Sequence, residues 1–183
     1  MRVIAGTARS LPLKTPRGTD TRPTTDRIKE TLFNMIQKEV PGSVFLDLFS
    51  GSGGIGIEAL SRGAKHAYFV ENDRNAISCI QENLVFTKFT DKATLIKQDV
   101  TAAFSMVPEH EVDIIFMDPP YRAGYENALF SQLAQQKYVT ENTLIIVEAQ
   151  LSREFDFVTE YGFEVIKEKH YKTNKHVFVS KRQ

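Results

Sequence analysis

The chain has 183 residues with no net formal charge, and 42% of them are hydrophobic and 25% charged. This composition is ordinary for one globular domain, and the length is sufficient to bury a sizeable core. The single cysteine, Cys79, excludes an intramolecular disulfide, and the sequence has neither a signal peptide nor an apolar stretch of transmembrane length, so we expect a cytoplasmic protein.

The charges are distributed unevenly along the chain. Residues 1–30 carry a net charge of +4 and residues 165–183 a net charge of +5, whereas the segment between them carries −9. Basic ends on an acidic body predict a local contact with a polyanion, although terminal charges are also often simply solvated. The basic side chains that we expect to make this contact are Arg2, Arg9, Lys14, Arg17, Arg22 and Arg27.

The first forty residues predict two small elements. Arg2–Ala5 and Leu11–Lys14 have the pattern of a short β-hairpin. Thr24 or Thr25 can cap a helix that runs to about Val40, since apolar residues recur on one face of it. The stretch between these elements suits either a contact with the polyanion or a lid over a bound ligand. Arg22 in this stretch and Arg27 in the helix therefore each have two possible roles.

Strands and helices then alternate, which predicts an α/β fold with a mostly parallel sheet, helices on both faces and right-handed crossovers. Two final strands joined by a turn predict an antiparallel hairpin that completes a seven-stranded sheet. The expected strands are Val44–Phe49, Ala67–Val70, Ala93–Ile96, Val112–Met117, Thr143–Glu148, Phe163–Tyr171 and His176–Ser180. After the strand Val44–Phe49 we expect a helix that ends at Arg62. The later helices are expected at Arg74–Thr87, in a short segment near Thr101 and at Tyr125–Gln135.

A glycine-rich turn follows the first of the parallel strands. Gly51, Gly53 and Gly56 match the G-x-G-x-x-G fingerprint, and Glu71 falls twenty residues after Gly51 at the end of the next strand. This spacing is typical of nicotinamide dinucleotide sites. Asp47 argues against that ligand, because a carboxylate just before the turn repels a pyrophosphate and suits a cation.

S-adenosylmethionine fits these residues better than a dinucleotide, because it has no phosphate and carries a sulfonium and an ammonium group. Glu71 can accept hydrogen bonds from its ribose hydroxyls, and Asp99, at the end of a later strand, can read the adenine edge. Asp99 also suits the cap of the helix that follows it. The residues that we expect to bind the cofactor are Asp47, Phe49, Gly51, Gly53, Gly56, Glu71, Asn72, Asp99 and Val100.

The segment Asp118-Pro119-Pro120-Tyr121 follows the apolar run Val112–Met117. Pro119 has no N–H, and Pro120 restricts Pro119 to extended geometry, so the carbonyl groups of this segment stay open as acceptors. A carboxylate, free carbonyls and an aromatic ring together suit the amino group of a planar base. The same sequence is also compatible with an ordinary proline-rich turn.

These motifs together resemble those of a known enzyme class. The order D-x-F-x-G-x-G, acidic strand end, D-P-P-Y is similar to that of Rossmann-type methyltransferases that modify exocyclic amines of nucleic-acid bases. The segments Gly6–Leu13 and Arg22–Phe33 narrow the resemblance to the bacterial small-subunit ribosomal RNA guanine-N2 methyltransferases of the D type, over essentially the whole chain.

The resemblance implies one methyltransferase domain over residues 1–183, with a basic extension at 1–23 and a catalytic core at 24–183. It implies transfer of a methyl group from S-adenosylmethionine to N2 of a guanine in 16S ribosomal RNA, within an assembling small subunit, with no obligate protein partner. The basic side chains would then contact RNA. The expected catalytic residues are Asp118, Pro119, Pro120 and Tyr121. We expect no metal, because the four histidines form no ligand cluster.

Other functions remain compatible with the sequence. An adenine-N6 methyltransferase can carry D-P-P-Y, but this chain has no room for a separate target-recognition domain. A protein glutamine methyltransferase usually has Asn at the first position of that motif. A cofactor-sensing RNA-binding module and a nicotinamide oxidoreductase are the remaining alternatives.

Overall fold

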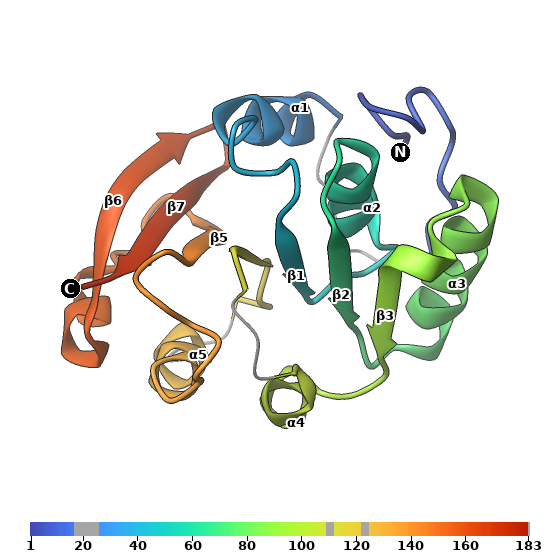
Figure 1. Ribbon diagram of the computed structural model, residues 1–183. Helices are drawn as coiled ribbons and strands as arrows, with labels where there is room; N and C mark the ends of the chain where they lie inside the picture. The colour runs from blue at the N-terminus through green and yellow to red at the C-terminus, as the bar shows by residue number, and fades with distance from the viewer. Residues whose placement is uncertain (17–25, 109–111, 122–124, 183) are drawn as a thin grey trace.

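The computed structural model describes residues 1–16, 26–108, 112–121 and 125–182, which form an α/β fold around one seven-stranded sheet (Figure 1). The strands are β1 (Val44–Leu48), β2 (His66–Val70), β3 (Ala93–Ile96), β4 (Ile114–Met117), β5 (Leu144–Gln150), β6 (Phe163–His170) and β7 (Asn174–Lys181). The α-helices are α1 (Asp26–Met35), α2 (Gly54–Ser61), α3 (Arg74–Thr87), α4 (Val100–Ala103) and α5 (Tyr125–Leu133). Short 3-10 helices lie at Thr90–Lys92, Phe104–Met106 and Asp156–Tyr161.

The strand order β3-β2-β1-β4-β5-β7-β6 confirms the predicted topology. Strands β1 to β5 are parallel, whereas β7 pairs antiparallel with both β5 and β6. The chain moves outward from β1 through β2 to β3 and then returns to β4 on the other side of β1. Ligands of such open sheets bind beyond the carboxyl ends of the strands at this reversal, so the topology directs attention to the ends of β1 and β4.

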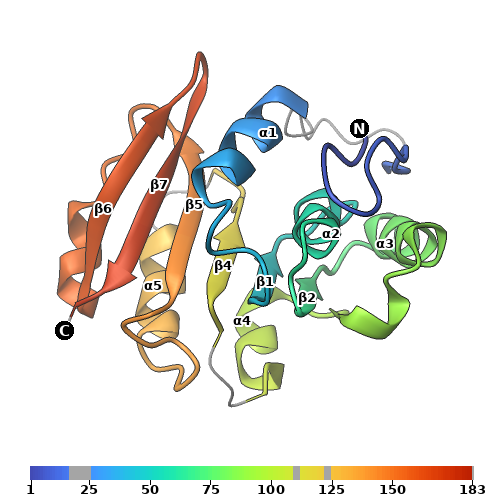
Figure 2. The same ribbon diagram turned by 45° about the horizontal axis from the view of Figure 1, so that its top comes forward.

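Alternating side chains of the sheet form two cores, one on each face. Phe45 of β1 packs with α1, α2 and α3, whereas its neighbours Leu46 and Leu48 pack with α4 and α5. The two groups of helices accordingly lie on opposite sides of the sheet (Figures 1 and 2). Asp47 lies between Leu46 and Leu48, so it belongs to the face that α2 covers. In the described part of the chain, no helix combines the length and apolar character that a membrane crossing requires.

Two elements near the N-terminus differ from the prediction. The predicted hairpin of residues 2–14 contains only one isolated bridge, Arg2↔Pro12, because the N–H of Leu11 donates to Ala8 within a turn and not across to Val3. The predicted helix to Val40 ends at Met35 and continues as turns. Pro41 disfavours helical geometry in Val40, so the helix could not extend through Val40 as predicted. The expected caps of this helix, Thr24 and Thr25, lie outside the described residues.

The N-terminal segment is attached to the outer side of α2 by buried polar contacts. Glu58 of α2 accepts hydrogen bonds from the N–H groups of Ile4 at 2.8 Å and Ala5 at 3.0 Å. Lys29 of α1, which is only 1% exposed, donates to the carbonyl oxygen of Arg2 at 2.6 Å and lies 3.4 Å from the Glu58 carboxylate. Every residue of α2 is therefore buried, between the sheet on one side and this segment on the other.

Replacing Glu58 with alanine is expected to lower the free energy of unfolding by about 3–5 kcal/mol, because the buried Lys29 ammonium would lose its counter-charge. Urea denaturation measures this difference. Glu39→Ala removes an exposed carboxylate and serves as the control, with an expected change within about 0.5 kcal/mol. A Glu58→Ala protein as stable as the control would show that the buried contact does not anchor the segment.

Candidate functional site

The three glycines of the turn after β1 have different structural roles. Gly53, the residue just before α2, has a φ of 79°, a left-handed conformation that is accessible to glycine at little cost. Gly56 packs against β2, because a Cβ atom there would lie 2.4 Å from the ring of Phe69. Gly51 also has a positive φ, of 55°, but a Cβ atom on it would meet nothing within 4 Å. The backbone is therefore open to a ligand at Gly51.

Asp47 and Phe49 shape the start of this turn. The Asp47 carboxylate is 1% exposed and accepts a hydrogen bond from the N–H of Gly56 at 2.9 Å. Phe49 has a φ of 60°, a strained value for a residue with a side chain, and such strain tends to occur at functional sites. Its ring contacts Tyr125, the first residue of α5, at a centroid distance of 5.8 Å. This contact joins the glycine turn to the segment that follows β4.

Glu71, directly after β2, holds the turn from the other side. Its carboxylate accepts hydrogen bonds from the N–H groups of Gly51 at 2.8 Å, and of Asn72 and Asp73 at 2.9 Å each. Glu71 and the glycine turn are thus brought together, as the spacing predicted. Asn72 is exposed beside them.

Asp99 and Val100 lie at the start of α4. Asp99 caps this helix, since its carboxylate accepts from the backbone N–H of Thr101 at 2.9 Å and from the Thr101 hydroxyl at 2.7 Å. The capping alternative is therefore correct, and a contact of Asp99 with adenine stays a prediction. The side chain of Val100 is 3% exposed and belongs to the core.

The Asp118–Tyr121 segment leaves the sheet at the end of β4. Pro119 is buried, Asp118 is half-buried and the ring of Tyr121 is 55% exposed. Burial raises the pKa of Asp118 to about 7, and the charge of Glu148 on β5 contributes to this rise. Burial also raises the pKa of the Tyr121 hydroxyl, with smaller contributions from Asp118 and Glu148.

The ends of β1 and β4 share one electrostatic environment. Burial raises the pKa of Asp47 to about 8, and the negative charges of Glu71 and Asp118 add to the effect although the Gly56 N–H opposes it. The carboxylates of Glu71 and Asp118, from two other strand ends, therefore both act on Asp47. A ligand that carries positive charge would relieve their repulsion.

The raised pKa values make stability dependent on pH. Because the folded protein holds protons on Asp47 up to about pH 8 and on Asp118 up to about pH 7, it binds more protons than the unfolded chain above pH 4. Stability should thus fall from pH 4 to pH 8, by up to about 1.4 kcal/mol per pH unit for each group. Asp47→Asn should flatten this slope in urea denaturation, whereas the exposed-site control Asp91→Asn should keep it. If stability fell with pH equally in the wild type, Asp47→Asn and Asp91→Asn, Asp47 would not be a source of the pH dependence.

Sequence reasoning missed a polar group beside Asp118. Glu148 of β5 accepts a hydrogen bond from Asn174 of β7 at 2.6 Å, and the Nε2 atom of His176 lies 3.4 Å from its carboxylate. Glu148 ends the predicted strand Thr143–Glu148, so the rule that selected the other strand-end acids would also have selected it. The two β7 residues became visible only with the strand pairing.

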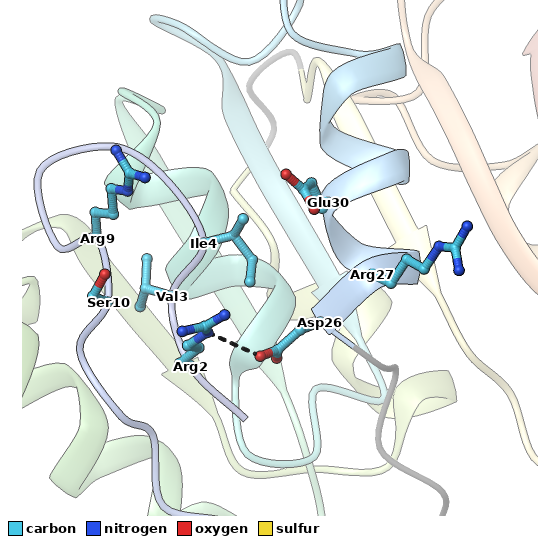
Figure 3. A pocket seen from close by; sticks show the side chains of 8 residues that line it. All are labelled: Arg2, Val3, Ile4, Arg9, Ser10, Asp26, Arg27 and Glu30. Atoms are coloured by element: carbon cyan, nitrogen blue, oxygen red, sulfur yellow. Dashed lines mark hydrogen bonds and ion pairs between the residues drawn. The ribbon is translucent and has the colours of Figure 1, made fainter.

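The predicted basic residues fall into separate groups. Arg2, Arg9 and Arg27 surround a hollow of about 370 Å³ together with Asp26 and Glu30, and Arg2 forms an ion pair with Asp26 at 3.2 Å (Figure 3). Lys14 is not part of this group, because it pairs with Glu82 of α3. Arg17 and Arg22 lie outside the described residues.

No group of three or more His, Cys, Asp or Glu side chains is arranged to hold a metal within residues 1–16, 26–108, 112–121 and 125–182. Cys79 of α3 is a free, half-buried thiol. Burial raises its pKa, and its negative neighbour Glu82 contributes to that rise, which disfavours the reactive thiolate.

Comparisons with known proteins agree with this arrangement. Residues 1–180 match the family model described as conserved hypothetical protein 95. The chain is 41% identical over 150 residues to YlbH of Bacillus subtilis, covering 81% of this chain and 82% of that protein. It is 33% identical over 171 residues to ribosomal RNA small subunit methyltransferase D of Haemophilus influenzae, covering 92% and 88% of the two chains.

A solved structure of yhhF from Escherichia coli superimposes with a TM-score of 0.86 at 30% sequence identity and covers 100% of this chain and 98% of that one. A match of this extent includes both the N-terminal segment and the final hairpin. The chain therefore belongs to the conserved hypothetical protein 95 family, the family of ribosomal RNA small subunit methyltransferase D.

Proposed function

We propose that this protein transfers a methyl group from S-adenosylmethionine to the exocyclic N2 of a guanine in small-subunit ribosomal RNA. The observation that carries the proposal is the position of Asp118-Pro119-Pro120-Tyr121 at the end of β4, next to the glycine turn at the end of β1. The printed names of the relatives support ribosomal RNA as the substrate. The choice of guanine N2 rests on the family resemblance of the sequence motifs.

The residues around the glycine turn fit S-adenosylmethionine. Gly51 leaves its backbone accessible, and Glu71 offers carboxylate oxygens to the ribose hydroxyls. The acidic environment of Asp47 suits a sulfonium and an ammonium group, and Phe49, Gly53, Gly56, Asn72, Asp99 and Val100 complete the proposed binding set. When bound, S-adenosylmethionine supplies an electrophilic methyl group that is carried by a positively charged sulfur.

The residues after β4 would hold the target base. The amino nitrogen of guanine is a poor nucleophile, because its lone pair is delocalised into the ring. Hydrogen bonds from this amino group to the Asp118 carboxylate and the Pro119 carbonyl would orient it toward the methyl group, an effect worth several kcal/mol. The exposed ring of Tyr121 would stack on the base, which must leave its helix or loop to reach the site.

Arg2, Arg9 and Arg27 are proposed to contact the RNA backbone, with Lys14, Arg17 and Arg22 as further contacts. The double variant Arg9→Ala/Arg27→Ala should weaken RNA binding and lower the slope of log K against log salt by about one unit for each lost phosphate contact. Lys38→Ala, an exposed control outside the hollow, should leave the slope unchanged. Filter binding over a range of salt concentrations measures it, and an unchanged slope in the double variant would exclude these two arginines from the RNA interface.

We further propose that residues 1–183 act as one methyltransferase domain, in which the anchored N-terminal segment carries part of the RNA interface. The function is tested by incubating the protein and methyl-labelled S-adenosylmethionine with small-subunit particles that lack the modification. Incorporation of label into the RNA is expected. Label in protein alone, or no label, would contradict the proposal.

A further inference from the structure

Glu148, a carboxylate of β5 to which the proposed function assigns no role, lies next to Asp118. Met117, the last residue of β4, pairs with Val147 of β5, so Asp118 directly follows β4 where Glu148 continues the neighbouring parallel strand. Met117 and Val147 both belong to the core on the α4 and α5 side, so Glu148 falls on the opposite face of the sheet by alternation. Glu148 is 9% exposed, which makes its charge poorly screened by solvent.

The final hairpin fixes the Glu148 side chain. Asn174 of β7, which is 7% exposed, donates to one carboxylate oxygen at 2.6 Å, and the Nε2 atom of His176 lies 3.4 Å from the other oxygen. His176 is fully buried and pairs with Glu148 across the β5–β7 ladder. The Tyr171 hydroxyl lies 3.1 Å from the Nδ1 atom of His176, so the neutral imidazole with its proton on Nε2 satisfies both contacts.

The charge of a buried carboxylate affects the protonation of titratable groups beside it. The charge of Glu148 acts on Asp118, on Tyr121 after β4 and on Tyr171 before β7, and it raises the pKa of each of these groups in addition to the effect of burial. The charge of Asp118 in turn raises the pKa of Asp47 on β1 and of Tyr121. Arg122, the next basic residue in the sequence, lies outside them.

The proposed reaction requires an acceptor for one proton. The bond between the amino nitrogen and the methyl carbon forms as the carbon–sulfur bond breaks, the electron pair of that bond stays on sulfur, and the nitrogen must lose a proton. A carboxylate accepts this proton better when a second negative charge stands beside it.

We propose that Glu148 is a positioning residue for this reaction: held by Asn174 and His176, its charge makes the neighbouring Asp118 carboxylate the proton acceptor for the target amine. The proposal rests on the proposed function for the identity of the amine. The proximity of Asp118 and Glu148, and the effect of the Glu148 charge on Asp118, do not depend on that function.

The first test measures Asp118 in the free, full-length protein, without RNA or S-adenosylmethionine. Carboxyl carbon NMR follows the titration of Asp118, assigned through the spectrum of Asp118→Asn. The midpoint should lie near pH 7 in the wild type and about one pH unit lower in Glu148→Gln, where burial alone remains. Glu164→Gln, which removes an exposed carboxylate from β6, should leave the midpoint unchanged. The same midpoint in wild type and Glu148→Gln would overturn the proposal.

The second test is the pH profile of kcat/KM for methyl transfer. The acidic limb of the wild type should report the ionisation of Asp118, and it should move to lower pH in Glu148→Gln by the shift that NMR measures. An unmoved limb overturns the role of Glu148, whereas a wild type that methylates no RNA overturns the proposed function instead. If circular dichroism shows that Glu148→Gln is unfolded, Glu148→Asp takes its place, and a smaller shift in the same direction is expected.

Discussion

Replacing Asp118 with alanine is expected to lower the turnover number by about two to four orders of magnitude, because the target amine loses both an orienting acceptor and its proton acceptor. The affinity for S-adenosylmethionine should change by less than about 1 kcal/mol, since the glycine turn and Glu71 remain intact. Single-turnover kinetics and isothermal titration calorimetry measure the two quantities separately.

Asp118→Asn provides a matched comparison for this variant. Asparagine keeps one acceptor oxygen at the same position but cannot take up the proton, so its turnover should lie between those of the wild type and Asp118→Ala. If Asp118→Ala retained wild-type turnover, the carboxylate at the end of β4 would have no part in the chemistry, and the proposed role of Glu148 would fail with it.

Replacing Glu71 with alanine is expected to weaken the binding of S-adenosylmethionine by about a hundredfold. Two hydrogen bonds from ribose hydroxyls to a charged acceptor would be lost, at about 1.5 kcal/mol or more for each. The N–H groups of Gly51, Asn72 and Asp73 would also lose their acceptor, which loosens the glycine turn.

Calorimetry on folded protein measures this loss, and Glu71→Gln serves as the comparison because glutamine keeps an uncharged acceptor of the same length. The glutamine variant should bind with intermediate affinity. Equal affinities of wild type and Glu71→Ala would remove Glu71 from the cofactor site and would leave it only the structural role of holding the turn.

Local patterns allowed much of the fold to be predicted. Helix α3 and strand β3 begin and end where the periodicity placed them, at Arg74–Thr87 and Ala93–Ile96. The glycine turn and Glu71 were predicted together, because their spacing reflects two successive parallel strands whose carboxyl ends meet at one edge. Such features depend on residues that are close in the sequence.

Contacts between distant segments could not be predicted in this way. Glu58 was not recognised as the anchor of residues 4 and 5, because nothing in the sequence of α2 shows that its outer side is covered. His176 lies opposite Glu148 only through the register of β5 and β7, which the sequence pattern did not specify. The hollow between Arg2 and Arg27 likewise depends on how the N-terminal segment lies along α1 (Figure 3).

The identity of the methylated nucleoside tests the central claim most directly. Small-subunit particles from cells that lack this protein are incubated with it and labelled S-adenosylmethionine, and the RNA is then digested to nucleosides and separated by chromatography. We expect the label to elute as N2-methylguanosine, and we expect Asp118→Ala to form this product at least about a hundredfold more slowly. Label in N6-methyladenosine, or in any nucleoside other than N2-methylguanosine, would contradict the central claim.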